Sequence, residues 1–286
     1  MNAENLYGYK PSIAAGVIFI ILFGLTTIYH AYQLIKARCW YFIPFLVGGI
    51  FQVIGYVCRV IGHSNTASVP IYAMQSLFIL LAPPLYAASV YMVLGRTVTY
   101  LNAEDLSLVP VKWMTKIFVS GDVFSFLLQS AGGGLMASGS ISTRNMGSNV
   151  VIGGLVVQLL FFGFFVIVAA VFQFRIQQRP TSKSQSELEM TRHLGWRQRN
   201  WTTVLLALYI VSALILIRSI FRLVEYKYGF NGYIMTHECF GYVFDALLMF
   251  VAMVVMNVYH PAVILGNGKG GNYQHSEEMQ LSHGWQ

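Results

Sequence analysis

Residues 149–174 of the chain are NVVIGGLVVQLLFFGFFVIVAAVFQF, a run of 26 residues with no charged side chain. A helix that rises about 1.5 Å per residue needs about 20 mostly apolar residues to cross a bilayer. This run therefore predicts a transmembrane helix, and six further stretches have the same character. The seven predicted spans cover residues 12–35, 41–62, 70–94, 113–136, 149–174, 202–223 and 237–259.

The composition of the whole chain supports a polytopic membrane protein. Hydrophobic residues make up 56% of the 286 residues and charged residues only 10%, whereas soluble domains carry about 25% charge. A soluble protein of this length could not bury so much apolar surface. The formal charge of +7 also occurs in proteins that bind nucleic acid, but here the charges cluster between the apolar runs. We therefore predict membrane lipids with an anionic surface as the partner, and no nucleic acid.

Lysine and arginine predict the orientation of the spans, because they concentrate in cytoplasmic connections. With the N-terminus outside, the inner segments hold twelve of them and the outer segments three. The expected fold is thus all-α, with seven transmembrane helices, the N-terminus outside and the C-terminus in the cytoplasm. It comprises an extracellular segment 1–11, a membrane domain 12–262 and a polar tail 263–286 that is predicted to be disordered. The basic inner segment 175–201 is expected to face the anionic cytoplasmic leaflet or to dock a cytoplasmic regulator.

Three sequence features predict local details of the backbone. The Pro-Pro pair at residues 83–84 predicts either a kink or freed carbonyl groups that face protein rather than lipid. The sequence AGGG at residues 131–134 predicts either a close approach of another backbone or a frayed helix end. Residues 52–59, QVIGYVCR, resemble residues 238–245, ECFGYVFD, which is either an inverted repeat of the kind found in transporters or a coincidence.

Polar side chains lie within the apolar runs, where a charge costs at least about 2.5–3.5 kcal/mol at the bilayer centre. Residues at i, i+3, i+4 and i+7 share one side of a helix, so each polar stripe is expected to face the interior of the bundle. The stripes are Gln52, Tyr56 and Arg59 in span 2; Asp122, Ser125, Gln129 and Gly133 in span 4; Arg218, Arg222 and Glu225 at span 6; and Glu238, Tyr242 and Asp245 in span 7.

Two interpretations of these stripes are open. The predicted orientation places the arginines and acids of spans 2, 6 and 7 in the outer half of the membrane. In one interpretation they form ion pairs that lock these three helices together. In the other they line an outward-open cavity, where the acids, especially Asp122 and Asp245, contact a ligand. The candidate substrate-binding residues are Asp122, Gln129, Glu238, Tyr242, Asp245, Gln52 and Tyr56, and the structural or substrate-pairing charges are Arg59, Arg218, Arg222 and Glu225.

Motifs of several enzyme classes are absent from the sequence. Neither the phosphate-binding pattern G-x-x-x-x-G-K-[ST] nor the nucleophile pattern G-x-S-x-G occurs. The seven histidines lie at opposite ends of spans, in a connection or in the tail, so they are not expected to gather three ligands at one depth for a metal ion. We therefore expect no enzymatic activity, no metal and no cofactor.

A series of motifs follows in order along residues 7–262. They are Tyr9-x-Pro11, Gly55-Tyr56-x-x-Arg59, Leu81-Ala82-Pro83-Pro84-Leu85-Tyr86-Ala87-Ala88-Ser89-x-Tyr91-Met92, Asp122-x-x-Ser125-x-x-x-Gln129-x-x-Gly132-Gly133-Gly134, Gly154-Leu155-x-x-Gln158, Arg218-x-x-x-Arg222-x-x-Glu225, Glu238-x-x-x-Tyr242-x-x-Asp245 and His260-Pro261. The series resembles the fungal lipid-translocating exporter family, which is named for resistance to aminocholesterol. One departure is Gln52, where the family usually carries glutamate; it puts in doubt any role of a span-2 acid in proton coupling or in binding a cationic head group.

The resemblance implies a seven-span protein, expected in the fungal plasma membrane and linked to resistance to toxic amphiphiles. The leading hypothesis is a translocator of amphipathic lipids, most plausibly sphingoid long-chain bases, whose cationic amine would pair with an intramembrane acid. A second hypothesis is a seven-helix lipid sensor or receptor-like regulator. A third is transport of porphyrin or another anionic substrate, which would move the key contacts from the acids to the arginines.

Overall fold

The computed structural model of the protein describes residues 11–64, 66, 68–136, 141–192, 200–228 and 237–265. This part of the chain is helical and contains no strand. The last span combines α9 (Glu238–Gly241), the π-helix η3 (Tyr242–Leu247) and α10 (Leu248–Val258). The helices are α1 (Ile13–Ala37), η1 (Trp40–Phe42), α2 (Ile43–Ser64), α3 (Val69–Tyr100), η2 (Glu104–Leu106), α4 (Val111–Met136), α5 (Ile141–Gln178), α6 (Ser182–Arg192), α7 (Trp201–Tyr228), α9 (Glu238–Gly241), η3 (Tyr242–Leu247), α10 (Leu248–Val258) and α11 (Ala262–Leu265).

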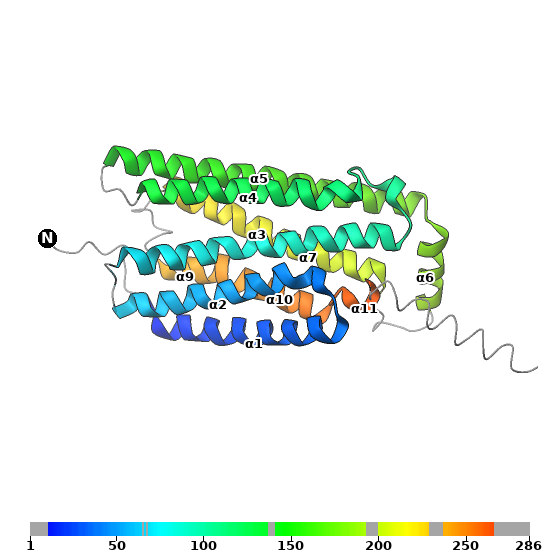
Figure 1. Ribbon diagram of the computed structural model, residues 1–286, viewed down its shortest axis with the longest axis horizontal. Coiled ribbons are helices and arrows are strands. Elements are labelled where there is room, and N and C mark those ends of the chain that lie inside the picture. The colour runs from blue at the N-terminus through cyan, green and yellow to red at the C-terminus, as the bar shows by residue number, and fades with distance from the viewer. Residues whose placement is uncertain are drawn as a thin grey trace, which may run out of the picture.

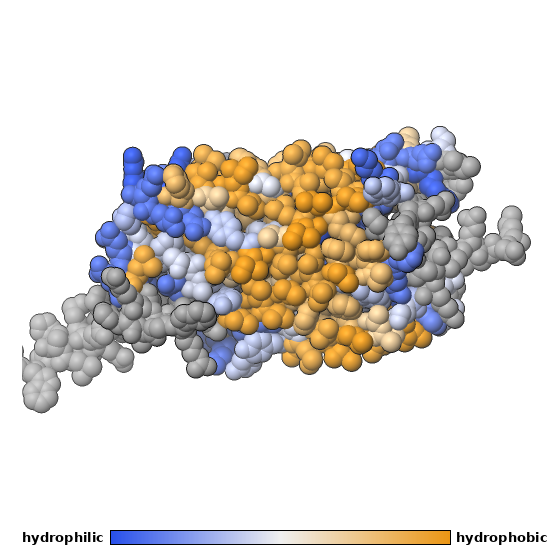
Figure 2. Space-filling view, turned by 180° about the vertical axis from the view of Figure 1, so that it is seen from behind, coloured by the Kyte–Doolittle hydropathy of each residue, from blue (hydrophilic) through white to orange (hydrophobic). Residues whose placement is uncertain are grey.

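The long helices form one bundle with an apolar middle and polar ends (Figures 1 and 2). Six helices in the described residues are long and apolar enough to cross a membrane, and the chain is an integral membrane protein. α4 is a further long helix of 26 residues that packs along α5, but charged, serine and glycine residues interrupt its apolar sequence. The predicted all-helical membrane fold is confirmed, whereas the side on which each terminus lies stays a prediction.

The two ends of the bundle are named here after the elements that lie there (Figure 1). At the α9 end, α2 ends at Ser64 and α3 begins at Val69. At the α6 end, α1 ends at Ala37 and α3 ends at Tyr100. The predicted orientation places the α6 end in the cytoplasm. Parts of three predicted segments lie outside the described residues, namely 1–10 at the N-terminus, 193–199 in the basic segment and 266–286 in the tail.

The basic segment 175–201 contains a helix that the sequence analysis did not predict. α6 runs across the end of the bundle, roughly perpendicular to the long helices (Figure 1). The hydroxyl of Tyr100 donates a hydrogen bond to Glu187 at 2.6 Å, and the hydroxyl of Thr181 donates to the carbonyl of Leu101 at 2.8 Å. These two contacts hold the start and the middle of α6 against the end of α3.

The Pro-Pro pair lies inside α3, which continues through it as a helix. Pro83 has no N–H to donate to the carbonyl of Ile79, four residues earlier. A guanidinium nitrogen of Arg218 on α7 donates to that carbonyl instead, at 3.0 Å. The prediction that a freed carbonyl faces protein is therefore confirmed, and the pair creates an acceptor in the core for a charged side chain.

Glycine permits the close packing of α4 against α5. A Cβ atom added to Gly132 would lie 2.6 Å from the carbonyl oxygen of Gly147, whereas one added to Gly133 or Gly134 would meet nothing within 4 Å. A Cβ atom added to Gly154 would likewise lie 2.9 Å from the carbonyl oxygen of Ser125. The close-approach interpretation of residues 131–134 is thus confirmed, and it depends on one glycine of the three.

Candidate functional site

Two arginines of α7 hold one carboxylate of the π-helix. Asp245 accepts hydrogen bonds from Arg218 through one oxygen and from Arg222 through the other. Arg222 also pairs with Glu225 on its own helix at 2.8 Å. Arg218 and Asp245 are each only 2% exposed, so the charges satisfy one another away from solvent. This contact joins α7 to the last span, and through the carbonyl of Ile79 it also reaches α3.

A second ion pair lies nearer the α9 end. Arg59 on α2 pairs with Glu238 on α9 at 3.0 Å and also donates to the hydroxyl of Tyr242 at 3.1 Å. Both oxygens of Glu238 lie 3.0 Å from the backbone N–H of Ser12, the residue that caps α1. Glu238 therefore connects the start of α1, the end of α2 and the last span.

The six charges of these contacts are called the charged cluster below. They comprise three cations and three anions, so the cluster has no net formal charge. Every acid in it has an arginine partner, and three of its four ion pairs join different helices. The geometry corresponds to the interpretation of an ion-pair lock between α2, α7 and the last span. The members of the charged cluster are Arg59, Arg218, Arg222, Glu225, Glu238 and Asp245.

The π-helix η3 sets the direction of Asp245. Its wider turn inserts one residue into the regular helical repeat, so the side chains on either side of it change register. The sequence analysis assumed a regular helix, in which Glu238, Tyr242 and Asp245 share one face. In the structure Glu238 and Tyr242 contact Arg59, whereas Asp245 contacts the arginines of α7. π-turns of this kind concentrate at functional sites, but residue type alone does not predict them.

Aromatic rings of α1, α2 and the last span pack beside the charged cluster. Tyr56 stacks on Phe19 and on Phe23, with centroids 5.6 Å apart in each case, and Tyr242 stacks on Phe19 at 5.3 Å. One helical turn from Tyr56, Gln52 is 1% exposed, and neither polar atom of its side chain has a hydrogen-bond partner among the described residues. The predicted residues of span 2 thus face the interior, as expected.

Asp122 lies in a different part of the bundle, between α3 and α4. Its side chain is 3% exposed and accepts a hydrogen bond from the hydroxyl of Tyr91 at 2.9 Å. The other carboxylate oxygen is buried and accepts no hydrogen bond from any residue that the structure describes. Further along α4, Gln129 donates to Gln158 of α5 at 3.0 Å. The structure therefore divides the predicted site residues into two groups rather than placing them around one cavity.

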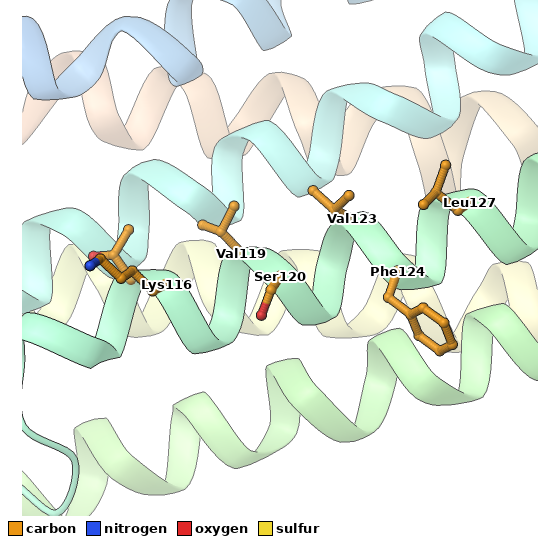
Figure 3. A pocket seen from close by; sticks show the side chains of 7 residues that line it. Lys116, Val119, Ser120, Val123, Phe124 and Leu127 are labelled. Carbon is orange, nitrogen blue, oxygen red and sulfur yellow. The ribbon is translucent and has the colours of Figure 1, made fainter.

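The outer surface of α4 carries a shallow groove of about 560 Å³ (Figure 3). Its lining is mostly apolar, with Lys116 toward the α6 end. At about 100° per residue, the centre of this face is turned by roughly 120° around the helix from the face that carries Asp122 and Gln129. The groove and the buried carboxylate thus occupy two sides of one helix. The residues of the groove are Thr115, Lys116, Val119, Ser120, Val123, Phe124 and Leu127.

Sequence reasoning missed the partners that define both groups. Tyr91 belongs to the motif series, but its hydrogen bond to Asp122 depends on the packing of α3 against α4. Ser12 is the first residue of the first predicted span and gave no signal of a contact with residue 238. In the described residues, no three histidine, cysteine, aspartate or glutamate side chains gather in a way that could hold a metal ion.

Comparison with known proteins extends these observations. The chain is 36% identical over 289 residues to Protoporphyrin uptake protein 1 of Saccharomyces cerevisiae, a match that covers 88% of this chain and 91% of that protein. It is 35% identical over 284 residues to Protein RTA1 of the same yeast, covering 91% and 86% of the two chains. It is 28% identical over 285 residues to the Sphingoid long-chain base transporter RSB1, covering 91% and 74%.

No solved structure matches the chain. The profile of the family described as RTA1 like protein matches residues 45–268, which is most of the membrane domain. The family resemblance inferred from the ordered motifs is therefore confirmed. From the extent of this match and the identity to relatives over most of its length, the chain belongs to the RTA1-like protein family.

Proposed function

We propose that the protein translocates amphipathic lipids with a cationic head group, most specifically sphingoid long-chain bases, in the fungal plasma membrane. Two kinds of support exist. The family includes a relative named as a sphingoid long-chain base transporter. The structure also offers one acid that is suited to an amine. The single observation that carries the proposal is that the buried carboxylate of Asp122 has no cationic partner among the described residues.

Among the buried acids that the structure describes, Asp122 is the one without a cationic partner in the described residues. Glu225 and Asp245 are engaged by arginines, and so is the more exposed Glu238. Asp122 receives one neutral hydrogen bond from Tyr91, and its second oxygen accepts none from the described residues. A buried carboxylate without a cation carries a large desolvation penalty, which a primary ammonium group would offset by charge and by hydrogen bonds.

The remaining polar groups of the predicted site divide between two roles. Gln129 lies two helical turns from Asp122 on the same face of α4, where it could contact the hydroxyl groups that follow the amine of a long-chain base. The groove on the adjoining, exposed face of the helix provides apolar surface for a hydrocarbon tail. The charged cluster serves to hold the helices together, with Tyr242 and Tyr56 packed beside it.

A second candidate is transport of an anionic amphiphile such as a porphyrin. The observation that favours it is the 36% identity to Protoporphyrin uptake protein 1. Carboxylate groups of such a ligand would require arginine partners. Arg59, Arg218 and Arg222 already pair with acids of the chain. An anionic ligand would therefore have to displace an internal acid, which makes this the weaker candidate.

The α6 end supplies the proposed contact with lipid head groups and with a regulator. The amine of Lys183 on α6 lies 4.1 Å from the centre of the Tyr100 ring, and Arg175 at the end of α5 donates to the carbonyl of Leu106 at 3.3 Å. If this end is cytoplasmic, these cations face the anionic leaflet. A sensor would use the same surface to dock a protein, so removing α6 would abolish signalling but leave lipid movement intact.

The test is movement of a fluorescent long-chain base across liposomes that contain the purified protein. Asp122→Asn keeps the shape of the side chain and an acceptor for Tyr91 but removes the charge. We expect its translocation rate to fall at least about tenfold, because a hydrogen bond to a charged group is lost. Asp105→Asn is the matched control, since Asp105 is exposed in η2 outside the bundle. Folded wild-type protein that moves no base would refute the proposal for this lipid.

A further inference from the structure

The cations at the two ends of the bundle have different kinds of partner. At the α9 end, Arg59 pairs with the carboxylate of Glu238 at 3.0 Å. At the α6 end, the amine of Lys116 on α4 lies 5.3 Å from the centre of the Trp113 ring, and it forms no ion pair with an acid in the described residues. An aromatic ring attracts a cation but carries no net charge. The positive charge of Lys116 is therefore not neutralised by Trp113 and can attract an anion.

Lys116 lies at one end of the groove on α4, and the groove continues along the same helix to Leu127 (Figure 3). Most of its lining is apolar. The side chains of Val123, Phe124 and Leu127 are each more than half exposed, so neighbouring helices leave this surface largely uncovered. Ser120, one helical turn from Lys116, adds a hydroxyl group near the cationic end. The groove thus has one cationic end and an otherwise apolar course.

The length of the groove corresponds to one leaflet of a bilayer. Leu127 follows Lys116 by eleven residues, which is about 16 Å along a helix. The hydrocarbon core of a bilayer is about 30 Å thick, so one leaflet contributes about 15 Å. Trp113, beside Lys116, is 59% exposed, and exposed tryptophan is typical of the membrane interface. The groove therefore begins at the interface of the α6 end and reaches about the middle of the bilayer.

A lipid that fits this groove has an anionic head group and an acyl chain about one leaflet long. The phosphate of an anionic phospholipid supplies the negative charge, and lysine binds phosphate as a point charge. Lys112, one helical turn nearer the end of the bundle, is exposed and adds a second positive charge. Both lysines would repel the ammonium group of a zwitterionic phospholipid or of a long-chain base. The charge of the groove therefore favours an anionic lipid.

We propose that the groove on α4 is a binding site for an anionic phospholipid, with the phosphate at Lys116 and one acyl chain along the apolar lining as far as Leu127. The site goes beyond the proposed function, because its occupant is a lipid of the membrane and not the translocated base. Its head group lies apart from Asp122, which is on another face of α4. The proposed function gives the same apolar lining to the tail of a base, so the base displaces the phospholipid from it.

The test measures binding of single lipids to the purified full-length protein in detergent by native mass spectrometry. Phosphatidylglycerol and phosphatidylcholine with the same two acyl chains are compared, so only the head group differs. Lys116→Gln removes the charge at the end of the groove, and Lys116→Arg keeps it. Lys36→Gln is the matched control, because Lys36 is also exposed and lies 5.5 Å from the centre of the Tyr32 ring, but on α1 outside the groove.

A second pair of variants tests the contact with the acyl chain. Val123→Trp fills the middle of the groove with a larger side chain, and the exposure of Val123 allows this without repacking the core. Ile167→Trp is its matched control, because Ile167 is 56% exposed on α5 and does not line the groove. Soluble glycerol 1-phosphate, which has the phosphate but no acyl chain, is added in excess as a competitor.

We expect wild type and Lys116→Arg to bind phosphatidylglycerol about fivefold more tightly than phosphatidylcholine, the effect of about one basic residue at an anionic lipid surface. Lys116→Gln should lose this preference and Lys36→Gln should keep it. Val123→Trp should weaken the binding of both lipids, Ile167→Trp should change neither, and glycerol 1-phosphate should displace neither.

Four results would overturn the site. They are a preference that survives in Lys116→Gln, an equal loss of preference in Lys36→Gln, unchanged binding in Val123→Trp, and displacement of phosphatidylglycerol by glycerol 1-phosphate, which would indicate a site for the phosphate alone. No long-chain base is present in these measurements. Their failure would therefore leave the proposed function standing, and failure of the translocation assay would leave this site standing.

Discussion

The charged cluster and the surroundings of Asp122 solve the same physical problem in opposite ways. Both place ionisable side chains in an apolar bundle, where an unpaired charge is costly. In the charged cluster, Asp245 is shared by Arg218 and Arg222, and Glu238 is held by Arg59 and by a backbone N–H. Among the residues that the structure describes, Asp122 has the hydroxyl of Tyr91 as its one hydrogen-bond partner.

This difference indicates that the charged cluster stabilises the fold, whereas Asp122 still has a carboxylate oxygen that can accept a hydrogen bond from a ligand. An acid with its hydrogen-bonding capacity filled by the protein has little to offer a ligand unless the protein first gives up a contact. An acid with an unused oxygen gains a partner when a cationic ligand arrives. We therefore expect substitutions in the charged cluster to affect stability most, and substitution of Asp122 to affect translocation most.

The largest loss of stability is expected for Asp245→Asn. This change leaves Arg218 and Arg222 buried without their shared carboxylate, and breaking a buried ion pair in this way costs about 3–5 kcal/mol. Thermal unfolding of the purified protein in detergent should show a melting temperature far below that of wild type. A melting temperature close to the wild-type value would mean that the two arginines find other partners. It would contradict the claim that the ion pairs of Asp245 hold α7 and the last span together.

A smaller loss is expected for Gly132→Ala. The added methyl group would lie 2.6 Å from the carbonyl oxygen of Gly147, so α4 and α5 must move apart. Overpacking of this kind costs about 1–3 kcal/mol. Gly133→Ala is the matched control, because an added Cβ there meets nothing within 4 Å. Equal melting temperatures for the two variants would contradict the close contact of these helices.

A loss of about 1 kcal/mol is expected from the coupling between Arg59 and Glu238, whose side chains are 11% and 17% exposed. The variants Arg59→Gln and Glu238→Gln and their combination form a double-mutant cycle. The combined loss of stability should be smaller than the sum of the two single losses, because each single variant already removes the pair. Additive losses would show that the ion pair contributes nothing measurable to the fold.

The smallest effect on stability is expected for Asp122→Asn, below about 1 kcal/mol. The amide oxygen still accepts the hydrogen bond of Tyr91, and the buried charge is gone. Its melting temperature should therefore stay near that of wild type while the translocation rate of the base falls at least about tenfold. A large fall in melting temperature would show that Asp122, like Asp245, is needed for the stability of the fold.

Much of the fold follows from patterns that the sequence shows directly. Long apolar runs predict the helices, and the stripes at i, i+3, i+4 and i+7 place Gln52, Asp122 and Arg218 in the interior, where all three are buried. Pro83 and Gly132 predict features of the backbone because their chemistry restricts what a helix can do around them. These signals depend on residues that are close together in the sequence, so they can be interpreted without knowing which helices pack against one another.

The division of the site residues could not be predicted, because it depends on which helices become neighbours. The sequence places six charges at similar depths but does not indicate that Asp245 turns toward α7 through a π-helix. The similar segments 52–59 and 238–245 contact each other in the structure, although this contact does not test whether they form an inverted repeat. Arg59, the last residue of the first segment, pairs with Glu238, the first residue of the second, as expected for two segments that run in opposite directions.

The most direct test of the central claim compares two substrates in two proteins. The translocation rates of sphinganine and N-acetylsphinganine are measured in liposomes with wild type and with Asp122→Asn. If the carboxylate of Asp122 recognises the amine, wild type prefers sphinganine at least about tenfold, and this preference disappears in Asp122→Asn. A preference that survives unchanged in the variant would show that Asp122 does not recognise the head group, and it would contradict the account.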